Sequence, residues 1–422
     1  MQQVPASMRL CLVLILAIII SLLPPIGVVA AGPLPLSAYP RPPQDNGFGI
    51  HWSTQIYGSP PDAVDYFVDE LSAMGVRWVK FLNDGTDGRH NDYLIKRLVE
   101  RGIMPVMRIY FRCNRALDLD SLRRLVEYYR PRGVFYYELF NEPEIPGEPG
   151  GWCDGEQPDS ERLLNIWLPA ARVIQQAGGF PAVPSLFPPS LKDPNWQESF
   201  FVRFFRGLKR RGETSILYRS WGAIHNYFLN HPPDYPYDEV NLTDHPLTSE
   251  EIAAGGLSPA EIVAINEARA RSRLSRAEGG YYLGSTVEDD PFGFLGFIAY
   301  RNLFYQIFGF EIPLISTEGG ATVGSTEDPR YPRVSERLMV EYTIQAFEYM
   351  LDRAPAYYFA SNTWLLAEQA LGRYGSPWES WAWYHDRAGD HLPVVERLKA
   401  HPRRGEARRS AAAPLPPPMA VA

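Results

Sequence analysis

The 422-residue sequence has no excess of basic residues, because its formal net charge is -8. Phosphate binding needs a basic face, so this charge argues against a nucleic-acid partner. An HxH-type pair of histidines is also missing, and no His, Asp and Glu side chains cluster at the spacing of metal ligands. We therefore expect neither a metal nor a cofactor. Internal repeats are missing from the sequence as well.

Long apolar runs are scarce, and the one near the amino terminus spans only residues 10–23. It is too short for a comfortable transmembrane helix but has the length of a signal-peptide core, and small residues for cleavage follow near Ala30. We expect residues 1–31 to be a signal peptide, with a retained amino-terminal membrane anchor as the alternative. The predicted location is therefore secreted or extracytoplasmic.

Cysteine is equally rare, with three residues in the whole chain. Cys11 lies inside the apolar run, which leaves Cys113 and Cys153 in the exported part. These two follow consecutive predicted strands, so a disulfide between neighbouring loops and two free thiols are both open.

The remaining composition is that of a globular protein, with 45% apolar, 13% aromatic and 21% charged residues. This composition excludes disorder and coiled coil for most of the chain. Residues 32–46 are rich in proline and lack periodicity, which predicts a spacer. The biased segment 401–422 is expected to be a disordered tail. One folded domain is therefore predicted over residues 47–400.

Short apolar runs alternate with amphipathic helical patterns through this domain. In each run the side chains that point to either face are apolar, as they must be in a strand that is covered on both faces. Eight such strands alternating with helices predict a (β/α)8 TIM barrel, with a doubly wound open sheet as the alternative. The predicted strands are residues 48–53, 76–82, 104–111, 133–140, 181–187, 221–228, 312–318 and 355–364.

One connection is longer than the others, because residues 230–290 are inserted after predicted strand six. The carboxyl ends of barrel strands form the face on which such folds build their sites. The insertion is therefore a candidate lid or substrate wall, and a purely structural excursion is the alternative.

Two glutamates lie where predicted strands end. Glu142 follows strand four and is stopped at once by Pro143, and Glu318 ends strand seven before two glycines. Strands four and seven lie across the barrel from each other, so the two carboxylates can face one another over a bound molecule. Retaining glycoside hydrolysis needs two carboxyl groups about 5 Å apart, one to donate a proton and one to attack the anomeric carbon. The pair predicts this chemistry.

Other side chains at the strand ends suit sugar binding. His225 and Tyr227 share one face of predicted strand six by its two-residue period, and Trp364 ends strand eight. His51 and Trp52 end strand one, where they are further candidates for sugar contact; we select Trp52, with packing at the barrel rim as the alternative.

Two more glutamates flank the predicted acid. Glu138 lies deeper on the same strand and is expected to pair inside the barrel, whereas Glu144 lies beyond the proline and is expected to be solvated.

These motifs, in this order, resemble the clan A glycoside hydrolases, the superfamily of retaining (β/α)8-barrel enzymes that includes the cellulase-like families. The resemblance spans the whole folded region and rests on "NEP" at 141–143, "HNY" at 225–227, "STEGG" at 316–320 and Trp364.

The resemblance implies a role for each matching residue. Glu142 would be the general acid/base and Glu318 the nucleophile. Asn141 would hydrogen-bond the sugar 2-hydroxyl, Tyr227 would orient the nucleophile, and Trp364 would stack on the sugar next to the cleaved bond.

The sequence departs from the family on predicted strand two, where many members place an arginine and this chain has Lys80. Lysine cannot reproduce a bidentate guanidinium. Arg108 on strand three is our expected substitute, and a structural salt bridge inside the barrel is the alternative.

Taken together, these patterns predict a secreted retaining glycoside hydrolase whose partner is a β-linked glycan or glycoside. A carbohydrate-binding barrel without turnover and a metal-dependent hydrolase are the alternatives. The sequence does not indicate an oligomeric state.

Overall fold

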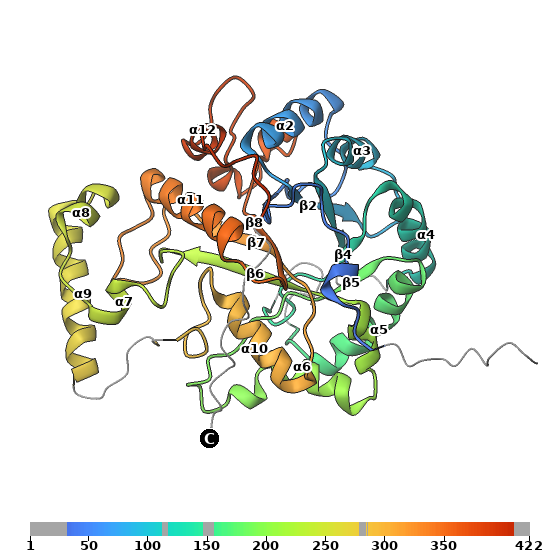
Figure 1. The fold of residues 1–422 in the computed structure, drawn as a ribbon, viewed down its shortest axis with the longest axis horizontal. Coiled ribbons are helices and arrows are strands. Elements are labelled where there is room, and N and C mark those ends of the chain that lie inside the picture. Colours follow the sequence, from blue (N-terminus) through green and yellow to red (C-terminus); the bar gives the residue numbers. More distant parts are fainter. Residues whose placement is uncertain (1–31, 112–116, 147–155, 278–283, 285, 409–422) are drawn as a thin grey trace, which may run out of the picture.

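The computed structural model describes residues 32–111, 117–146, 156–277, 284 and 286–408. Eight parallel strands close into a barrel in chain order, with helices outside them, which confirms the predicted (β/α)8 barrel (Figure 1). The strands are β1 (Phe48–His51), β2 (Trp78–Asp84), β3 (Met104–Tyr110), β4 (Tyr136–Leu139), β5 (Phe180–Val183), β6 (Trp221–Leu229), β7 (Leu314–Ala321) and β8 (Tyr358–Thr363).

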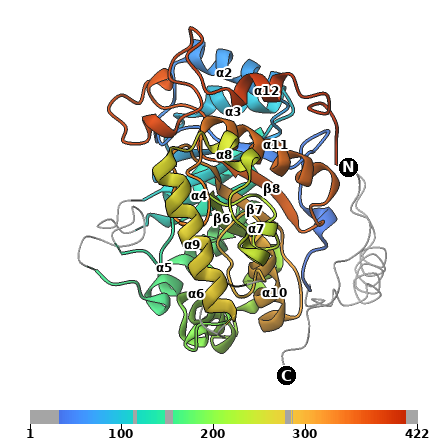
Figure 2. The same cartoon turned by 90° about the vertical axis from the view of Figure 1, so that its left-hand side faces the viewer.

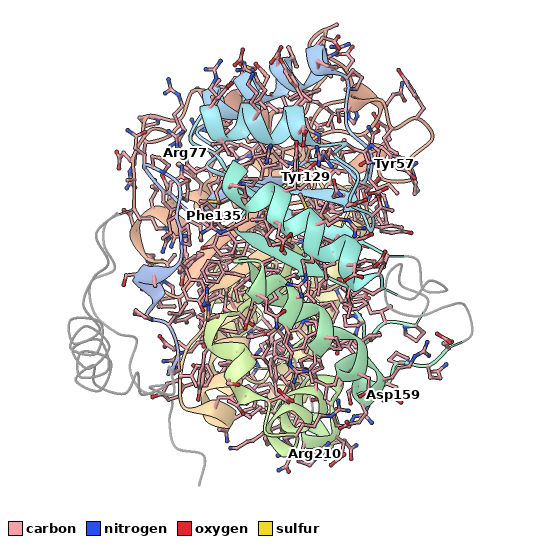
Figure 3. The ribbon with its side chains drawn as sticks, turned by 90° about the vertical axis from the view of Figure 1, so that its right-hand side faces the viewer. Tyr57, Arg77, Tyr129, Phe135, Asp159 and Arg210 are labelled. Carbon is pink, nitrogen blue, oxygen red and sulfur yellow. The ribbon has the colours of Figure 1, made fainter. Side chains whose placement is uncertain are left out.

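The outer layer consists of amphipathic helices that bury their apolar faces against the strands, and Figure 3 shows α3, α4 and α5 side by side in this layer. Side chains of Asp118, Asp159, Ser199 and Ser335 accept backbone N–H groups at the starts of α4, α5, α6 and α11. The helices of this layer are α2 (Pro61–Met74), α3 (Asp92–Glu100), α4 (Leu119–Tyr129), α5 (Ser160–Gln176), α6 (Phe200–Arg210), α10 (Gly296–Phe308), α11 (Glu336–Asp352) and α12 (Val394–Lys399).

The barrel interior changes from apolar to charged along the strands. Trp78 and Tyr136 belong to a buried aromatic cluster at the amino-terminal end of the barrel. Two residues further along the same strands, Lys80 and Glu138 are fully buried. Alternate residues of a strand share a face, so each strand carries its charged side chain directly above an apolar one. The charged groups therefore lie directly above a buried apolar layer, on the side of the carboxyl ends of the strands.

Parts of the segments predicted as spacer and tail pack against this apolar layer. The folded domain therefore extends beyond the predicted residues 47–400. Tyr39 is buried in the aromatic cluster and donates its hydroxyl to the Ser220 carbonyl at 3.0 Å. The Arg408 guanidinium donates to the carbonyls of Tyr358 and Phe359 at 2.7 and 2.6 Å. Single anchors of this kind carry no periodic signal, so the sequence pattern did not indicate them.

The described part of the insertion forms α7 (Glu239–Thr243), α8 (Ser249–Gly255) and α9 (Pro259–Ala277) at one edge of the molecule, beside α11 (Figures 1 and 2). Buried Arg269 ties it down, donating to the Arg330 carbonyl at 2.8 Å and to Glu251 at 2.6 Å. The Arg330 side chain in turn pairs with Asp328 at 2.8 Å. The insertion is thus anchored to the loop between β7 and α11.

Several predictions fall on parts of the chain that the structure does not describe. These are the signal peptide or anchor in residues 1–31, the Cys113 and Cys153 pairing, and the tail from residue 409 onward. Among the described helices, none has both the length and the apolar character of a membrane span.

Candidate active site

The carboxylate of Glu318 lies at the centre of a buried cluster of charges. Its Oε1 is 2.8 Å from the Lys80 ammonium and 3.2 Å from Nη1 of Arg108. Its Oε2 accepts the Tyr227 hydroxyl at 2.9 Å. The two cations therefore gather on one oxygen, while the other oxygen keeps a single neutral donor.

The second carboxylate reaches the same place from β4. Nδ1 of His225 lies 2.6 Å from Oε1 of Glu142 and 3.8 Å from Oε2 of Glu318. These contacts limit the separation of the two carboxylate oxygens to about 6.4 Å at most. The structure thus brings together the two glutamates that the sequence placed at the ends of strands four and seven.

A turn at the end of β4 presents Glu142. Phe140 has a left-handed backbone with φ 65, and its ring joins the outer apolar cluster near Phe111. The turn interrupts the alternation of the strand, so Asn141 and Glu142 follow it at the carboxyl end of the barrel. Asn141 is buried there.

An irregular register between β6 and β7 presents Glu318. Ile224 pairs with Ser316, but the next residue, His225, pairs with Glu318, so Thr317 has no partner in the register. Thr317 donates its hydroxyl to Glu138 at 3.0 Å, and the adjacent Glu318 bonds Lys80. Two successive side chains of β7 therefore reach the charged interior, which a regular strand would not allow.

The electrostatics keep Glu318 ionised. Burial alone would raise the pKa of its carboxyl, but Lys80, His225 and Arg108 outweigh burial and hold the pKa well below its ordinary value. Burial raises the pKa of the Tyr227 phenol well above its ordinary value, and Glu318 adds to this effect. Tyr227 is therefore a neutral donor to a charged acceptor.

The histidines of the site are tuned in opposite directions. Burial would lower the pKa of His225, but Glu318 and Glu142 outweigh burial and raise it. Burial and the Lys80 charge hold the pKa of His51 well below its ordinary value. His225 is therefore drawn toward the charged form between two carboxylates, while His51 stays neutral.

Both basic groups weighed at the sequence level contact Glu318. Lys80 takes the closer position, and Arg108 adds a second contact to the same oxygen. Lys80 also lies 3.9 Å from Oε2 of Glu138, so the deeper glutamate pairs inside the barrel as expected. The expected substitution of Arg108 for Lys80 was therefore too simple, because the two cations act on Glu318 together.

An aromatic wall stands beside Glu318. Trp364 directly follows β8, and its ring lies 4.5 Å from that of His51 and 5.6 Å from that of Trp378. Tyr227 and Trp381 pack against the same cluster. Trp378 remains partly open to solvent, so the wall has an accessible edge.

Trp52 does not belong to the site, which corrects the prediction of a sugar contact. Its ring is buried outside the barrel against Phe67 of α2, and its Nε1 donates to Ser59. Neighbouring strand residues point to opposite faces, so His51 enters the barrel and Trp52 leaves it. His51 lies 4.0 Å from Glu318 Oε1 and belongs to the site, although Trp52 was selected in its place from the sequence. The alternation of side chains along β1 could have indicated that only one of these two neighbours faces the barrel interior.

Glu144 is partly buried, whereas the sequence indicated a solvated side chain. Its carboxylate accepts the backbone N–H of Phe187, in the loop after β5. Burial raises the pKa of Glu144 to about 8, and the neighbouring Glu142 adds to the rise although the Phe187 amide opposes it. The loops after β4 and β5 are thereby joined beside the carboxylate pair.

Metal ligation finds no support in the described part of the chain, where no three His, Cys, Asp or Glu side chains are grouped to hold an ion.

Neither a protein-family model nor a curated protein matches the sequence. Solved structures do match the fold. An endo-1,4-beta-mannanase from Rhizomucor miehei is 12% identical, with 88% of this chain and 97% of that chain covered and a TM-score of 0.41.

An endo-beta-1,4-mannanase from Thermotoga petrophila is 11% identical, with 86% of this chain and 77% of that chain covered and a TM-score of 0.44. A triple mutant of an endo-beta-1,4-glucanase from Xanthomonas axonopodis pv. citri is 10% identical, with 85% of this chain and 98% of that chain covered and a TM-score of 0.40. Identities and TM-scores as low as these assign neither a family nor an activity to this chain.

Proposed function

We propose that the chain is a glycoside hydrolase that cleaves β-linked O-glycosidic bonds with retention of anomeric configuration. The observation that carries the proposal is the facing pair of Glu142 and Glu318, held on either side of His225 Nδ1. Retaining enzymes keep their carboxyl groups about 5–5.5 Å apart, whereas inverting enzymes need about 6.5–9.5 Å to admit a water. The upper limit of about 6.4 Å between Oε1 of Glu142 and Oε2 of Glu318 is compatible with the retaining arrangement.

The environments of the two carboxylates assign their roles. Glu318 is ionised among cations, so it is the nucleophile, and Oε2 is the attacking oxygen because Lys80 and Arg108 both occupy Oε1. Glu142, on the other side of His225, is then left as the proton donor. Tyr227 holds Oε2 in place through its hydroxyl.

The reaction follows in two displacements. In the first, Glu142 donates its proton to the glycosidic oxygen, Glu318 forms a bond to the anomeric carbon, and the leaving group departs as an alcohol. In the second, ionised Glu142 takes a proton from water, and the resulting hydroxide displaces Glu318. One water is consumed, and both glutamates return to their starting protonation states.

The sugar itself would lie between the carboxylate pair and the aromatic wall. Trp364 offers an apolar face of the kind on which a sugar ring stacks, and Asn141 lies beside Glu142 to bond a hydroxyl group. Export of the enzyme remains a prediction from residues 1–31.

A panel of 2-deoxy-2-fluoro glycosides, with the labelled peptide located by mass, tests the proposal. We expect a covalent label on Glu318, none in Glu318→Gln, and an undiminished label in Glu138→Gln, a matched loss of a buried carboxylate on the barrel interior. A label on another residue would overturn the assignment. Sugar binding with neither label nor product would instead favour a carbohydrate-binding barrel, an alternative suggested by the two cations that hold Glu318.

A further inference from the structure

A cavity of about 230 Å³ lies along β6 and shares two residues with the candidate active site. It is bounded by His225 and Tyr227, the residues of β6 that contact Glu142 and Glu318. The other walls come from the loop after β5, the outer side of β6 and the segment that leads into α10. They include Leu186, Phe187, Ile224, Leu229, Phe292 and Tyr300.

The cavity wall is mostly apolar, and its polar side chains are those of His225, Asn226, Tyr227 and Tyr300. Tyr300 is fully buried, and its hydroxyl has no hydrogen-bond partner among the described residues. Burial, with a smaller effect of Glu144, raises the pKa of Tyr300, so its hydroxyl stays protonated at neutral pH. A mostly apolar wall with so few polar groups is suited to a ligand with very few polar atoms.

The size and polarity of the cavity distinguish between two kinds of ligand. A dry cavity of about 150 Å³ lined by aliphatic and aromatic side chains holds a benzene ring. The present cavity therefore has room for a substituted phenyl ring. A sugar unit would bury several hydroxyl groups against apolar walls, where each loses its bonds to water without replacement.

The position of the cavity indicates which part of a substrate enters it. The leaving group of a glycoside must lie on the side of the proton donor, because its oxygen receives the proton. His225 borders the cavity and contacts Glu142, and Glu144 links the strand that carries Glu142 to Phe187 in the cavity wall.

We propose that this cavity binds the leaving group of the substrate, and that this group is a compact aromatic alcohol. The enzyme would then act on β-linked aryl or benzyl glycosides and not within a continuous polysaccharide. This inference rests on the proposed glycosidase function.

The wild-type protein provides the first test. Benzyl and methyl glycosides of the same sugar release alcohols of similar acidity, so the ratio of their kcat/KM values reports contacts with the leaving group. We expect the benzyl glycoside to be favoured by roughly tenfold or more, as for apolar groups that fill a pocket. A ratio near one would overturn the proposal.

Variants at the cavity mouth provide the second test. Phe292 is 51% exposed, so Phe292→Ala removes part of the wall with little effect on folding, and Tyr305→Ala is the matched control, 41% exposed on α10 and outside the lining. We expect Phe292→Ala to lower the benzyl-to-methyl ratio several-fold and Tyr305→Ala to preserve it. A high ratio that Phe292→Ala leaves unchanged would place the benzyl group elsewhere and overturn the proposal.

Binding of free benzyl alcohol, followed by ligand-observed NMR, separates this inference from the proposed function. Binding that Phe292→Ala weakens would support the cavity as an aromatic site even if no glycoside were hydrolysed, a result that would refute only the glycosidase proposal. Hydrolysis of glycosides without any binding of benzyl alcohol at millimolar concentration would leave the glycosidase and overturn the cavity assignment.

Discussion

Replacing Lys80 by methionine tests whether the charged cluster on Glu318 depends on this one cation. The ammonium is fully buried, 2.8 Å from Glu318 and 3.9 Å from Glu138. Methionine is flexible enough to fill the apolar space of the lysine stem, so the effect of Lys80→Met is mainly electrostatic. Removing one partner of a buried ion pair costs about 3–5 kcal/mol, because the other charge is left uncompensated. Arg108 remains on Glu318, so we expect a loss near the lower limit.

Urea unfolding at pH 7, followed by circular dichroism, measures this loss. The matched control is Lys96→Met on α3, where the lysine is 66% exposed and lies 3.9 Å from Glu100. Exposed pairs of this kind contribute about 0–1 kcal/mol. Equal losses in the two variants would refute the conclusion that Lys80 compensates a buried charge.

The same variant makes a prediction for catalysis. Lys80 is the largest of the charges that lower the pKa of Glu318, so Lys80→Met raises that pKa toward its ordinary value. The acidic limb of the pH profile of kcat/KM reports ionisation of the free enzyme's nucleophile and should move to higher pH. An acidic limb that stays in place would show that Glu318 does not control it.

Two further predictions concern the residues whose positions corrected the sequence analysis. The folded state keeps a proton on Glu144 between pH 4.5 and about 8, whereas the unfolded state loses this proton above pH 4.5. The free energy of unfolding therefore falls as the pH rises through this window, by up to about 1.4 kcal/mol per pH unit. Glu144→Gln abolishes that loss, so its stability relative to wild type should rise from pH 5 to pH 8 in urea unfolding. A difference independent of pH would contradict the burial of Glu144. Trp52→Ala should cost about 3–5 kcal/mol of stability, as for other large core aromatics, and leave KM unchanged. A raised KM in a protein of normal stability would restore Trp52 as a sugar contact.

The barrel could be predicted because its signals are local and repeated. Runs that are apolar on both faces mark strands covered on both sides, and the Asp and Ser caps mark the helix starts. The carboxyl end of a barrel strand is also a defined place, so Glu142 and Glu318 could be assigned to one bowl before any geometry was known. The irregular segments at both ends of the domain gave no such pattern, so the burial of Tyr39 and Arg408 was missed.

The sequence by itself thus determined the fold, the strands that carry the candidate carboxylates and the two-residue periods that set His225 beside Tyr227. Only the tertiary structure decided the contacts between strands that are distant in sequence. The left-handed turn at Phe140 and the irregular pairing of β6 with β7 aim the two glutamates, and both depend on how neighbouring segments pack. The pKa of Glu318 is likewise a property of the assembled barrel, because the charges that lower it come from three other strands and act only at distances of a few ångströms.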